Sequence, residues 1–349
     1  MKIAQVAPLW ERVPPFRYGG IELVVSLLTE ELIRRGHEVT LFASGDSITD
    51  AKLVSVRDKA LRFDPDLKDP PVYELLMMGE IFENADQFDI IHSHVGFATL
   101  PYGALIKTPI VHTTHGIFTP DNEKIFSKYK DQAYLSISDA QREERLGLNY
   151  VSTVYNGIET SVYPFEAKPQ DPPYMAFVGR MSPEKGPEGA VKIARATGMP
   201  LKMAGKVDAV DVEYFEAKVK PMIDGEQIQY LGEVSHEQKS ELLRNSALTL
   251  FPITWREPFG LVMVEAMASG SPVIGSKMGS VPEVVAHGKT GFVCETIEEM
   301  IEAVPEALKL DRQTCRDYVE ENFSVKSMVD SYLAAYEKVL NNQGQKAAA

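Results

Sequence analysis

The sequence is poor in cysteine and has no long apolar segment. Of its 349 residues only Cys294 and Cys315 are cysteines, too few for a disulfide framework or a zinc site built on cysteines. No uninterrupted apolar run reaches about 18 residues, so no transmembrane helix is expected. The first residues, 1–8, form a short strand-like run without the longer apolar region of a signal peptide. These absences together predict a cytoplasmic protein.

Positive charge is also scarce. The chain carries 36 basic and 50 acidic residues, for a net charge of −14. A field of that sign disfavours nucleic acid and anionic membrane surfaces, so we expect no nucleic-acid partner and at most a peripheral membrane contact. Hydrophobic and charged contents of 44% and 25% fit a globular protein, and the length allows two domains with cores of their own. An anionic ligand would therefore need a few well-placed cations.

The glycine-rich fingerprint of nicotinamide dinucleotide enzymes, G-x-G-x-x-G, is absent. The first strand-like run is followed instead by Tyr18-Gly19-Gly20, at the start of a long amphipathic stretch. Paired glycines let a ligand approach the backbone and leave N–H groups available at a helix start. The segment is therefore either a ligand-binding turn or a simple turn before a helix, and a dehydrogenase is disfavoured.

Apolar strand-like runs alternate with amphipathic helical ones along the chain. The expected strands are 2–7, 39–43, 88–91, 109–113, 133–137 and 151–155, then 174–179, 201–204, 228–231, 247–252 and 272–275. The expected helices include 20–35, 101–106, 140–146, 261–268 and 327–340. This alternation predicts α/β domains, each a parallel sheet covered by helices.

A proline-rich polar stretch separates the two halves, with prolines at 164, 169, 172 and 173. We expect two facing Rossmann-like domains with a cleft between them, the first at 1–165 and the second at 166–324. A final helix at about 325–340 and a disordered tail at 341–349 would follow. Ligands of such sheets bind beyond the carboxyl ends of the strands, so the cleft is the expected site.

Two glutamates, Glu257 and Glu265, carry the strongest chemical signal. Glu257 stands before Pro258, just after the predicted strand 247–252, and Glu265 lies in the predicted helix 261–268. A helix N-terminus, which favours phosphate, lies between the two acids. Acids on both sides of an anion site suit a ligand with hydroxyl-rich sugars on both sides of a diphosphate. That ligand is a nucleotide-sugar.

Arg180 and Lys185 follow the first predicted strand of the second half. The planar fork of an arginine and the point charge of a lysine can together neutralise a diphosphate. A solvated surface loop is the alternative for this segment taken alone.

Four of the seven histidines gather in His92-Ser93-His94 and in the segment from His112 to His115, each at the end of a predicted strand. Zinc would need further ligands, but no acidic residue accompanies them at a recognised spacing such as H-E-x-x-H, so no metal site is expected. His92 and His112 fit a buried, hydrogen-bonded role. His94 and His115 are the better candidates to contact sugar hydroxyls.

These motifs together resemble the retaining glycosyltransferases of the GT-B fold, in the large family-four group that includes glycogen synthase, sucrose synthase and mannosyltransferases (group 1 glycosyltransferases). The matching segments are 180–186, 257–265, 266–274, 279–285 with Gly288 and Gly291, Gly19-Gly20, 92–94, His115-Gly116 and 154–158. The resemblance covers nearly the whole chain and is most specific in the second half. It also implies that the last helix crosses back onto the first domain.

The resemblance implies a role for each motif residue. Glu265 would bind the ribose hydroxyls, and Glu257 would contact the transferred sugar and stabilise positive charge at its anomeric carbon. Arg180 and Lys185 would bind the diphosphate and stabilise the charge of the leaving group. His94 matches the position that meets the transferred sugar.

The resemblance also implies further substrate contacts. Gly19 and Gly20 would approach the diphosphate from the first domain. Lys206 and the turn that contains Val234 would line the base pocket. The other expected substrate-binding residues are Tyr18, His115, Phe259, Gly260, Leu261 and Val262.

The implied reaction moves a hexose from a UDP-, GDP- or ADP-sugar to a hydroxyl of a sugar or other acceptor, with retention of anomeric configuration. Since arginine, lysine and helix N-termini meet the phosphate charge, neither a metal nor another cofactor is expected. One alternative is a nucleotide-sugar 2-epimerase, which would act on the donor alone. Another is a non-catalytic nucleotide-sugar-binding protein, against which the intact Glu257, Arg180 and Lys185 argue.

Loops of the first domain, at 9–18, 44–50, 61–72 and 118–130, are expected to select the acceptor. These motifs leave open the donor sugar and base, the linkage and the oligomeric state. The first loop mixes aromatic and cationic side chains, as a sugar-binding or anion-binding loop would, but an uncommitted lid is an equal alternative. The charge of −14 favours a soluble acceptor over a lipid-linked one.

Overall fold

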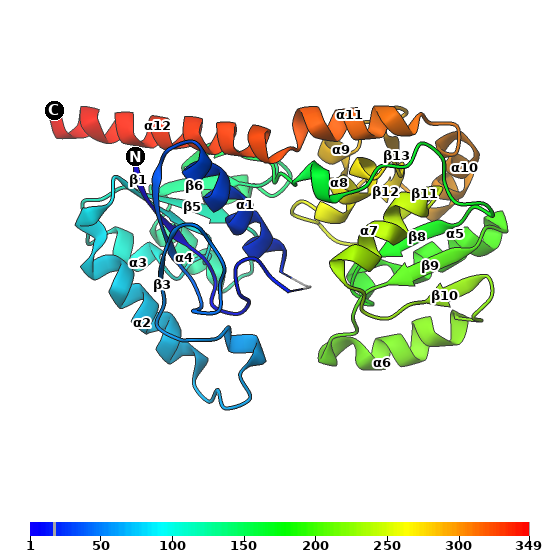
Figure 1. The fold of residues 1–349 in the computed structure, drawn as a ribbon, viewed down its shortest axis with the longest axis horizontal. Coiled ribbons are helices and arrows are strands. Elements are labelled where there is room, and N and C mark those ends of the chain that lie inside the picture. The colour runs from blue at the N-terminus through cyan, green and yellow to red at the C-terminus, as the bar shows by residue number, and fades with distance from the viewer. Residues whose placement is uncertain (17–18, 349) are drawn as a thin grey trace. The chain divides into compact units, whose positions relative to one another are not determined.

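The chain divides into two compact units. The computed structural model describes residues 1–16 and 19–348, so the predicted site residue Tyr18 lies outside the described residues. Unit 1 consists of Met1–Gly157 and Val325–Ala349, and unit 2 of Ile158–Ser324 (Figure 1). The expected boundary between 165 and 166 is wrong. Ile158 already belongs to unit 2, because its backbone N–H donates to the carbonyl of Phe323 over 2.9 Å.

Unit 1 contains a seven-stranded sheet in the order β3-β2-β1-β4-β5-β6-β7, with every pairing parallel. The strands are β1 (Lys2–Val6), β2 (Glu38–Phe42), β3 (Lys52–Val54), β4 (Ile90–Ser93), β5 (Ile110–Thr114), β6 (Ala133–Ser136) and β7 (Tyr150–Thr153). All residues of β4 and β5 are buried. This is typical of a parallel sheet with helices on both faces, and it explains the continuous apolar runs in the sequence.

The helices of unit 1 include the C-terminal one. They are α1 (Gly20–Arg34), α2 (Pro70–Glu83), α3 (Leu100–Gly103), α4 (Asn122–Lys128) and α12 (Val325–Ala348). In α12, Tyr332 and Tyr336 are fully buried, and the helix packs against α1. The expected disordered tail at 341–349 is wrong as far as Ala348, because the helix continues to that residue. The segment is free of proline and contains three alanines, two glutamines and one lysine, which favour helix.

Unit 2 contains a six-stranded parallel sheet in the order β10-β9-β8-β11-β12-β13. Its strands are β8 (Met175–Val178), β9 (Leu201–Ala204), β10 (Ile228–Tyr230), β11 (Leu248–Phe251), β12 (Val273–Ser276) and β13 (Gly291–Cys294). Its helices are α5 (Pro187–Thr197), α6 (Val212–Tyr214), α7 (His236–Asn245), α8 (Leu261–Ala268), α9 (Val281–Val284), α10 (Ile297–Ala307) and α11 (Arg312–Asn322).

A buried guanidinium ties several segments of unit 2 together. Arg312, only 6% exposed, begins α11 and donates to four backbone carbonyls in three other segments. The acceptors are the carbonyls of Glu166 at 2.7 Å, Ser246 at 2.7 Å, Arg244 at 2.6 Å and Ser269 at 3.3 Å. These carbonyls end the linker, α7 and α8, so one side chain satisfies groups that helix ends leave unpaired.

The prediction also differs from the structure at two edge strands and one helix. The edge strands β3 and β13 are absent from the prediction, since each is short and only partly buried and therefore lacks an apolar run. The helix predicted at 140–146 is wrong, because only the 3₁₀ turn Glu144–Leu146 forms there. Gln141 is buried and its side-chain amide bonds the backbone of Ile137, Thr114 and Gly116, which holds the segment as a loop.

Candidate functional site

The two motif glutamates lie at the carboxyl end of the unit 2 sheet. Glu257 follows β11, and Glu265 lies inside α8. Gly260 precedes α8 with a φ of 77°, a left-handed conformation that glycine adopts at low cost, and so permits the sharp turn from strand to helix. The side chains are nearly buried, with exposed fractions of 7% for Glu257 and 3% for Glu265. The predicted strand–turn–helix arrangement is confirmed.

Glu257 is held by a lysine and a tryptophan. Lys185 Nζ lies 2.5 Å from Oε2 of Glu257, and the indole Nε1 of Trp255 donates to the same oxygen over 2.8 Å. The Lys185 ammonium also lies 4.8 Å from the centre of the Trp255 ring. The structure therefore brings together the predicted Glu257 and Lys185. Trp255 is missing from the prediction although it stands two residues before Glu257. The single N–H donor of its indole is the feature that could have indicated a hydrogen bond to this glutamate.

Glu265 is held in the same way by residues that the sequence prediction lacks. The hydroxyl of Tyr163 donates to Oε1 of Glu265 over 2.8 Å, and Lys239 Nζ lies 2.6 Å from that oxygen. Burial, and next the charge of Glu265, raise the pKa of Tyr163, so its hydroxyl stays protonated and donates. Lys239 lies on α7, close after Val234, which is half-buried in the preceding turn. Neither Tyr163 nor Lys239 has a motif spacing that would reveal it.

Arg180 lies among carboxylates. Its guanidinium contacts Glu184 at 2.6 Å and Asp208 at 3.4 Å, and Lys206 contacts Asp208 at 2.8 Å. Burial alone would raise the pKa of Asp208, but the hydrogen bonds and charges of Lys206 and Arg180 outweigh it and lower that pKa. Two cations and two carboxylates therefore form one charged cluster near the end of β8 and β9. An incoming anion would have to share or replace these contacts.

The turn before α8 has mixed roles. The Phe259 side chain is 2% exposed and packs in the core, while its carbonyl accepts from Ser280 Oγ over 2.7 Å. Gly260, Leu261 and Val262 are half-buried. Leu261 and Val262 begin α8, where backbone N–H groups have no partner within the helix. These N–H groups, and not the Phe259 ring, are what this turn offers a ligand.

In unit 1 the histidines form a buried hydrogen-bonded chain. His94 Nε2 donates to Oε1 of Gln5 over 3.1 Å, so His94 Nδ1 accepts from His115 Nε2, 2.9 Å away. Gln5 Nε2 donates to the hydroxyl of Tyr336 over 3.1 Å. Tyr336 lies 2.7 Å from His92 Nδ1 and joins this chain to α12. His94 is 2% exposed with both ring nitrogens occupied, whereas His115 is only half-buried.

The start of α1 holds a carboxyl that the sequence prediction lacks. Gly19 has a φ of 145° and is buried, while Gly20 is exposed. A Cβ on Gly19 would lie 3.0 Å from Oε2 of Glu22. Burial, with a smaller contribution from the charge of Glu11, raises the pKa of Glu22 to about 7. The side chains of Pro15 and Glu22 therefore lie close against the backbone of Gly19.

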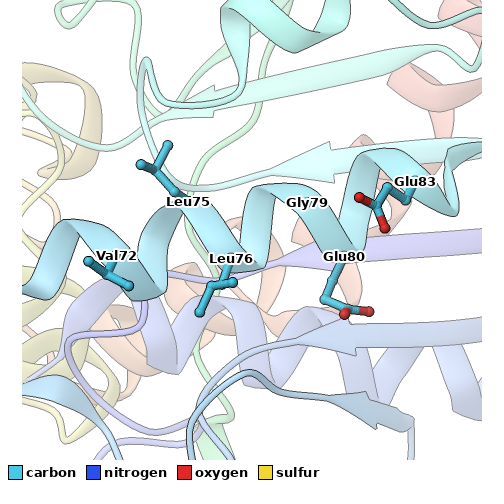
Figure 2. Close-up of a pocket in the computed structure, with 6 residues that line it drawn as sticks. All are labelled: Val72, Leu75, Leu76, Gly79, Glu80 and Glu83. Atoms are coloured by element: carbon cyan, nitrogen blue, oxygen red, sulfur yellow. The ribbon is translucent and has the colours of Figure 1, made fainter.

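The surface hollow of Figure 2 contains none of the predicted catalytic or substrate-binding residues, although Val72 ends the predicted acceptor loop 61–72. Val72, Leu75 and Leu76 project from α2, and Glu80 and Glu83 lie further along the same helix. The three aliphatic side chains are half-exposed or more. They form an apolar patch with an acidic end, and no predicted catalytic or substrate-binding residue belongs to it.

No group of three or more metal-ligating His, Cys, Asp or Glu side chains occurs within 1–16 and 19–348. Over the same residues, no helix is both long and apolar enough to cross a membrane. Of the four clustered histidines, His94 and His115 bond each other, and the cluster also bonds neighbouring tyrosine, threonine and glutamine side chains.

Comparison with known proteins assigns the family. The model of the glycosyl transferases group 1 matches residues 162–324, and that of glycosyltransferase family 4 matches residues 18–162. The chain belongs to the group 1 glycosyltransferases. The resemblance drawn from the motifs is confirmed, and two Rossmann-like units with parallel sheets are the GT-B architecture that it implied.

Relatives of this glycosyltransferase span nearly its whole length. An uncharacterized glycosyltransferase of Methanocaldococcus jannaschii is 27% identical over 336 aligned residues, with 84% of each chain covered. The crystal structure of AviGT4, a glycosyltransferase involved in avilamycin A biosynthesis, superposes with a TM-score of 0.76 at 25% identity and covers 97% of this chain and 98% of its own. The structure of Anabaena HepE with UDP-glucose gives a TM-score of 0.72 at 17% identity and covers 97% of this chain and 100% of its own.

The buried histidines of unit 1 predict that this unit loses stability in weak acid. Burial lowers the pKa of His112 to about 4, so the folded unit keeps this histidine neutral while the unfolded chain takes a proton below about 6.5. The free energy of unfolding should therefore fall as the pH drops from 6.5 towards 4. His112 alone should account for about 2 kcal/mol at pH 5.

Urea unfolding at pH 8 and pH 5 measures this loss. In a Trp255→Phe background, Trp10 is the remaining tryptophan and its emission reports on unit 1. A His112→Gln variant should show a shallower pH dependence than its parent. An unfolding midpoint that is the same at both pH values would contradict the prediction.

Gly279 should be required for the position of Glu257. A Cβ at Gly279 would lie 2.3 Å from the carbonyl oxygen and 2.4 Å from the nitrogen of Glu257, and Gly279 has a φ of +53°. Gly288 has a φ of +74° but open space around its Cβ, so Gly288→Ala is a matched control. Both alanines cost about 1–2 kcal/mol for the left-handed backbone. Only Gly279→Ala should also abolish glycosyl transfer, measured as donor turnover, and equal activities would contradict this role.

Proposed function

We propose that the protein transfers a hexose from a nucleoside-diphosphate sugar to an acceptor hydroxyl, with retention of anomeric configuration and without a metal ion or other cofactor. The observation that carries the proposal is the pair Glu257 and Glu265. Each is nearly buried, yet only one oxygen of each is bonded to a described residue. The other oxygen is left to accept hydroxyl groups, which both the sugar and the ribose of such a donor supply.

The cations of unit 2 suit the diphosphate between those sugars. Arg180, Lys185 and Lys206 follow β8 and β9, at the carboxyl ends of parallel strands where ligands of such sheets bind. HepE, which shares the fold, has been solved with UDP-glucose. Positive side chains that meet the phosphate charge leave no need for a divalent ion, and this supports metal-independent transfer.

In this mechanism Glu265 binds the ribose and Glu257 the transferred sugar. The acceptor oxygen forms a bond to the anomeric carbon as the bond from that carbon to the β-phosphate oxygen breaks, and the electron pair passes to the phosphate. That phosphate oxygen takes the acceptor proton, while Arg180 and Lys185 stabilise the charge. His94 holds the ring of His115, so that contact with the sugar falls to His115. The proposal includes the cytoplasmic location expected from the sequence.

Donor binding is tested by thermal shift with UDP-, GDP- and ADP-sugars and the free diphosphates, all in EDTA. A ligand of the folded state raises the melting temperature by mass action. The ligands of one nucleotide are expected to raise the melting temperature clearly. With that donor and an acceptor panel, proton NMR of the product reads the anomeric configuration. An inverted product, activity that needs added magnesium, or conversion of the donor sugar without acceptor would each contradict one part of the proposal, the last in favour of an epimerase.

Arg180→Ala should lower kcat strongly with a smaller change in KM. Loss of one electrostatic donor to a developing charge typically costs about 10²–10³ in rate, or about 3–4 kcal/mol. Arg195→Ala is the control, because Arg195 is exposed and interacts with the backbone carbonyl of Met222 and the charge of Asp224, away from the motif residues. Steady-state kinetics on both variants makes the comparison. Full activity of Arg180→Ala would contradict the assignment of Arg180 to the diphosphate site.

A further inference from the structure

Each motif glutamate of unit 2 is bonded at one oxygen by the same kind of pair, a lysine and an aromatic side chain with a single polar hydrogen. At Oε2 of Glu257 the pair is Lys185 at 2.5 Å and Trp255 at 2.8 Å. At Oε1 of Glu265 the pair is Lys239 at 2.6 Å and Tyr163 at 2.8 Å. The two sites arise from different elements, so the repetition is not a consequence of one local turn.

The second oxygen of each carboxylate is open. No described residue donates to Oε1 of Glu257 or to Oε2 of Glu265, and neither atom is sealed away from solvent. The residues themselves are only 7% and 3% exposed. A nearly buried carboxylate with one accessible, unpaired oxygen is arranged to accept a hydrogen bond from a ligand.

The two members of each pair do different work. A lysine ammonium is a point charge with three rotatable donors, so it holds the charge of the carboxylate without fixing its plane. The indole of Trp255 has one N–H with a fixed direction, and the phenol of Tyr163 has one hydroxyl on a fixed ring. The aromatic donor therefore determines which carboxylate oxygen is hydrogen-bonded within the protein and which one faces the ligand.

Both aromatic side chains are themselves held in place. Tyr163 is 2% exposed, its ring packs edge-on against His236 at 5.2 Å, and its carbonyl accepts from Arg316 over 2.7 Å. The half-buried Trp255 ring lies beside the Lys185 ammonium. Replacing either by phenylalanine removes the polar hydrogen and keeps an aromatic ring in the space.

We propose that Trp255 and Tyr163 are positioning residues, each dedicated to one half of the donor. Trp255 orients Glu257 toward the transferred sugar, and Tyr163 orients Glu265 toward the ribose. This assignment rests on the proposed function, because it divides a nucleotide-sugar between the two carboxylates. It predicts that the two variants discriminate between a free nucleoside diphosphate and the complete nucleotide-sugar.

Isothermal titration of Tyr163→Phe and Trp255→Phe with both ligands tests this division, using the nucleotide found in the thermal-shift panel. Tyr163→Phe should weaken the binding of the free diphosphate and of the nucleotide-sugar by the same factor, about tenfold for one lost hydrogen bond to a charged group. Trp255→Phe should change the affinity for the free diphosphate by no more than about twofold. It should weaken the binding of the nucleotide-sugar about tenfold and lower kcat.

Tyr174→Phe is the matched control. Tyr174 is a buried tyrosine of the same unit whose hydroxyl donates to the carbonyl of Leu242 over 2.8 Å, so its loss removes an equivalent hydrogen bond away from both glutamates. This variant should lower the melting temperature about as much as Tyr163→Phe and leave both affinities unchanged. A purely structural role for Tyr163 would make the two tyrosine variants alike in binding.

The outcomes separate the inference from the proposed function. Suppose that the wild-type protein binds its nucleotide, but Tyr163→Phe and Trp255→Phe change the affinities for both ligands in parallel or change neither affinity. The positioning roles are then wrong and the proposed function stands. A wild-type protein that binds no nucleoside diphosphate and no nucleotide-sugar contradicts the proposed function and this inference together.

Discussion

Burial of both faces of each parallel sheet is the constraint on which the rest of this structure depends. Strands such as β4, β5 and β11 have no exposed residue, so any polar side chain within them must find a partner inside the protein. The chain of His92, His94, Gln5 and Tyr336 in unit 1 meets this requirement and at the same time joins the sheet to α12. In unit 2 the carboxyl ends of β8, β9 and β11 are followed by Arg180, Lys206 and Glu257.

The carboxylates at those ends show how the constraint leads to chemistry. Burying an ionised carboxylate costs several kcal/mol unless a charge and hydrogen bonds compensate it. Lys185 and Lys239 supply the charge for Glu257 and Glu265, and Trp255 and Tyr163 supply the hydrogen bonds. Because each lysine and its aromatic partner bond the same oxygen, each glutamate still has a second oxygen to offer a ligand.

The acidic character of the chain acts in the same region. With a net charge of −14, isolated cations are few, and Arg180 and Lys206 are engaged by Glu184 and Asp208. These ion pairs keep the cations in place at the ends of β8 and β9 in the absence of a ligand. A diphosphate would compete with the carboxylates for them, so its two negative charges are an advantage over a singly charged anion.

The sequence by itself determined the α/β class, the family and the elements with strong apolar patterns, such as β9 at Leu201–Ala204 and α8 at Leu261–Ala268. Such elements follow from local periodicity and turn chemistry, which one chain segment contains in full. Only the tertiary structure decided the edge strands β3 and β13 and the partners of the glutamates. Tyr163 lies 102 positions from Glu265 in the chain, and its role depends on packing that brings distant segments together.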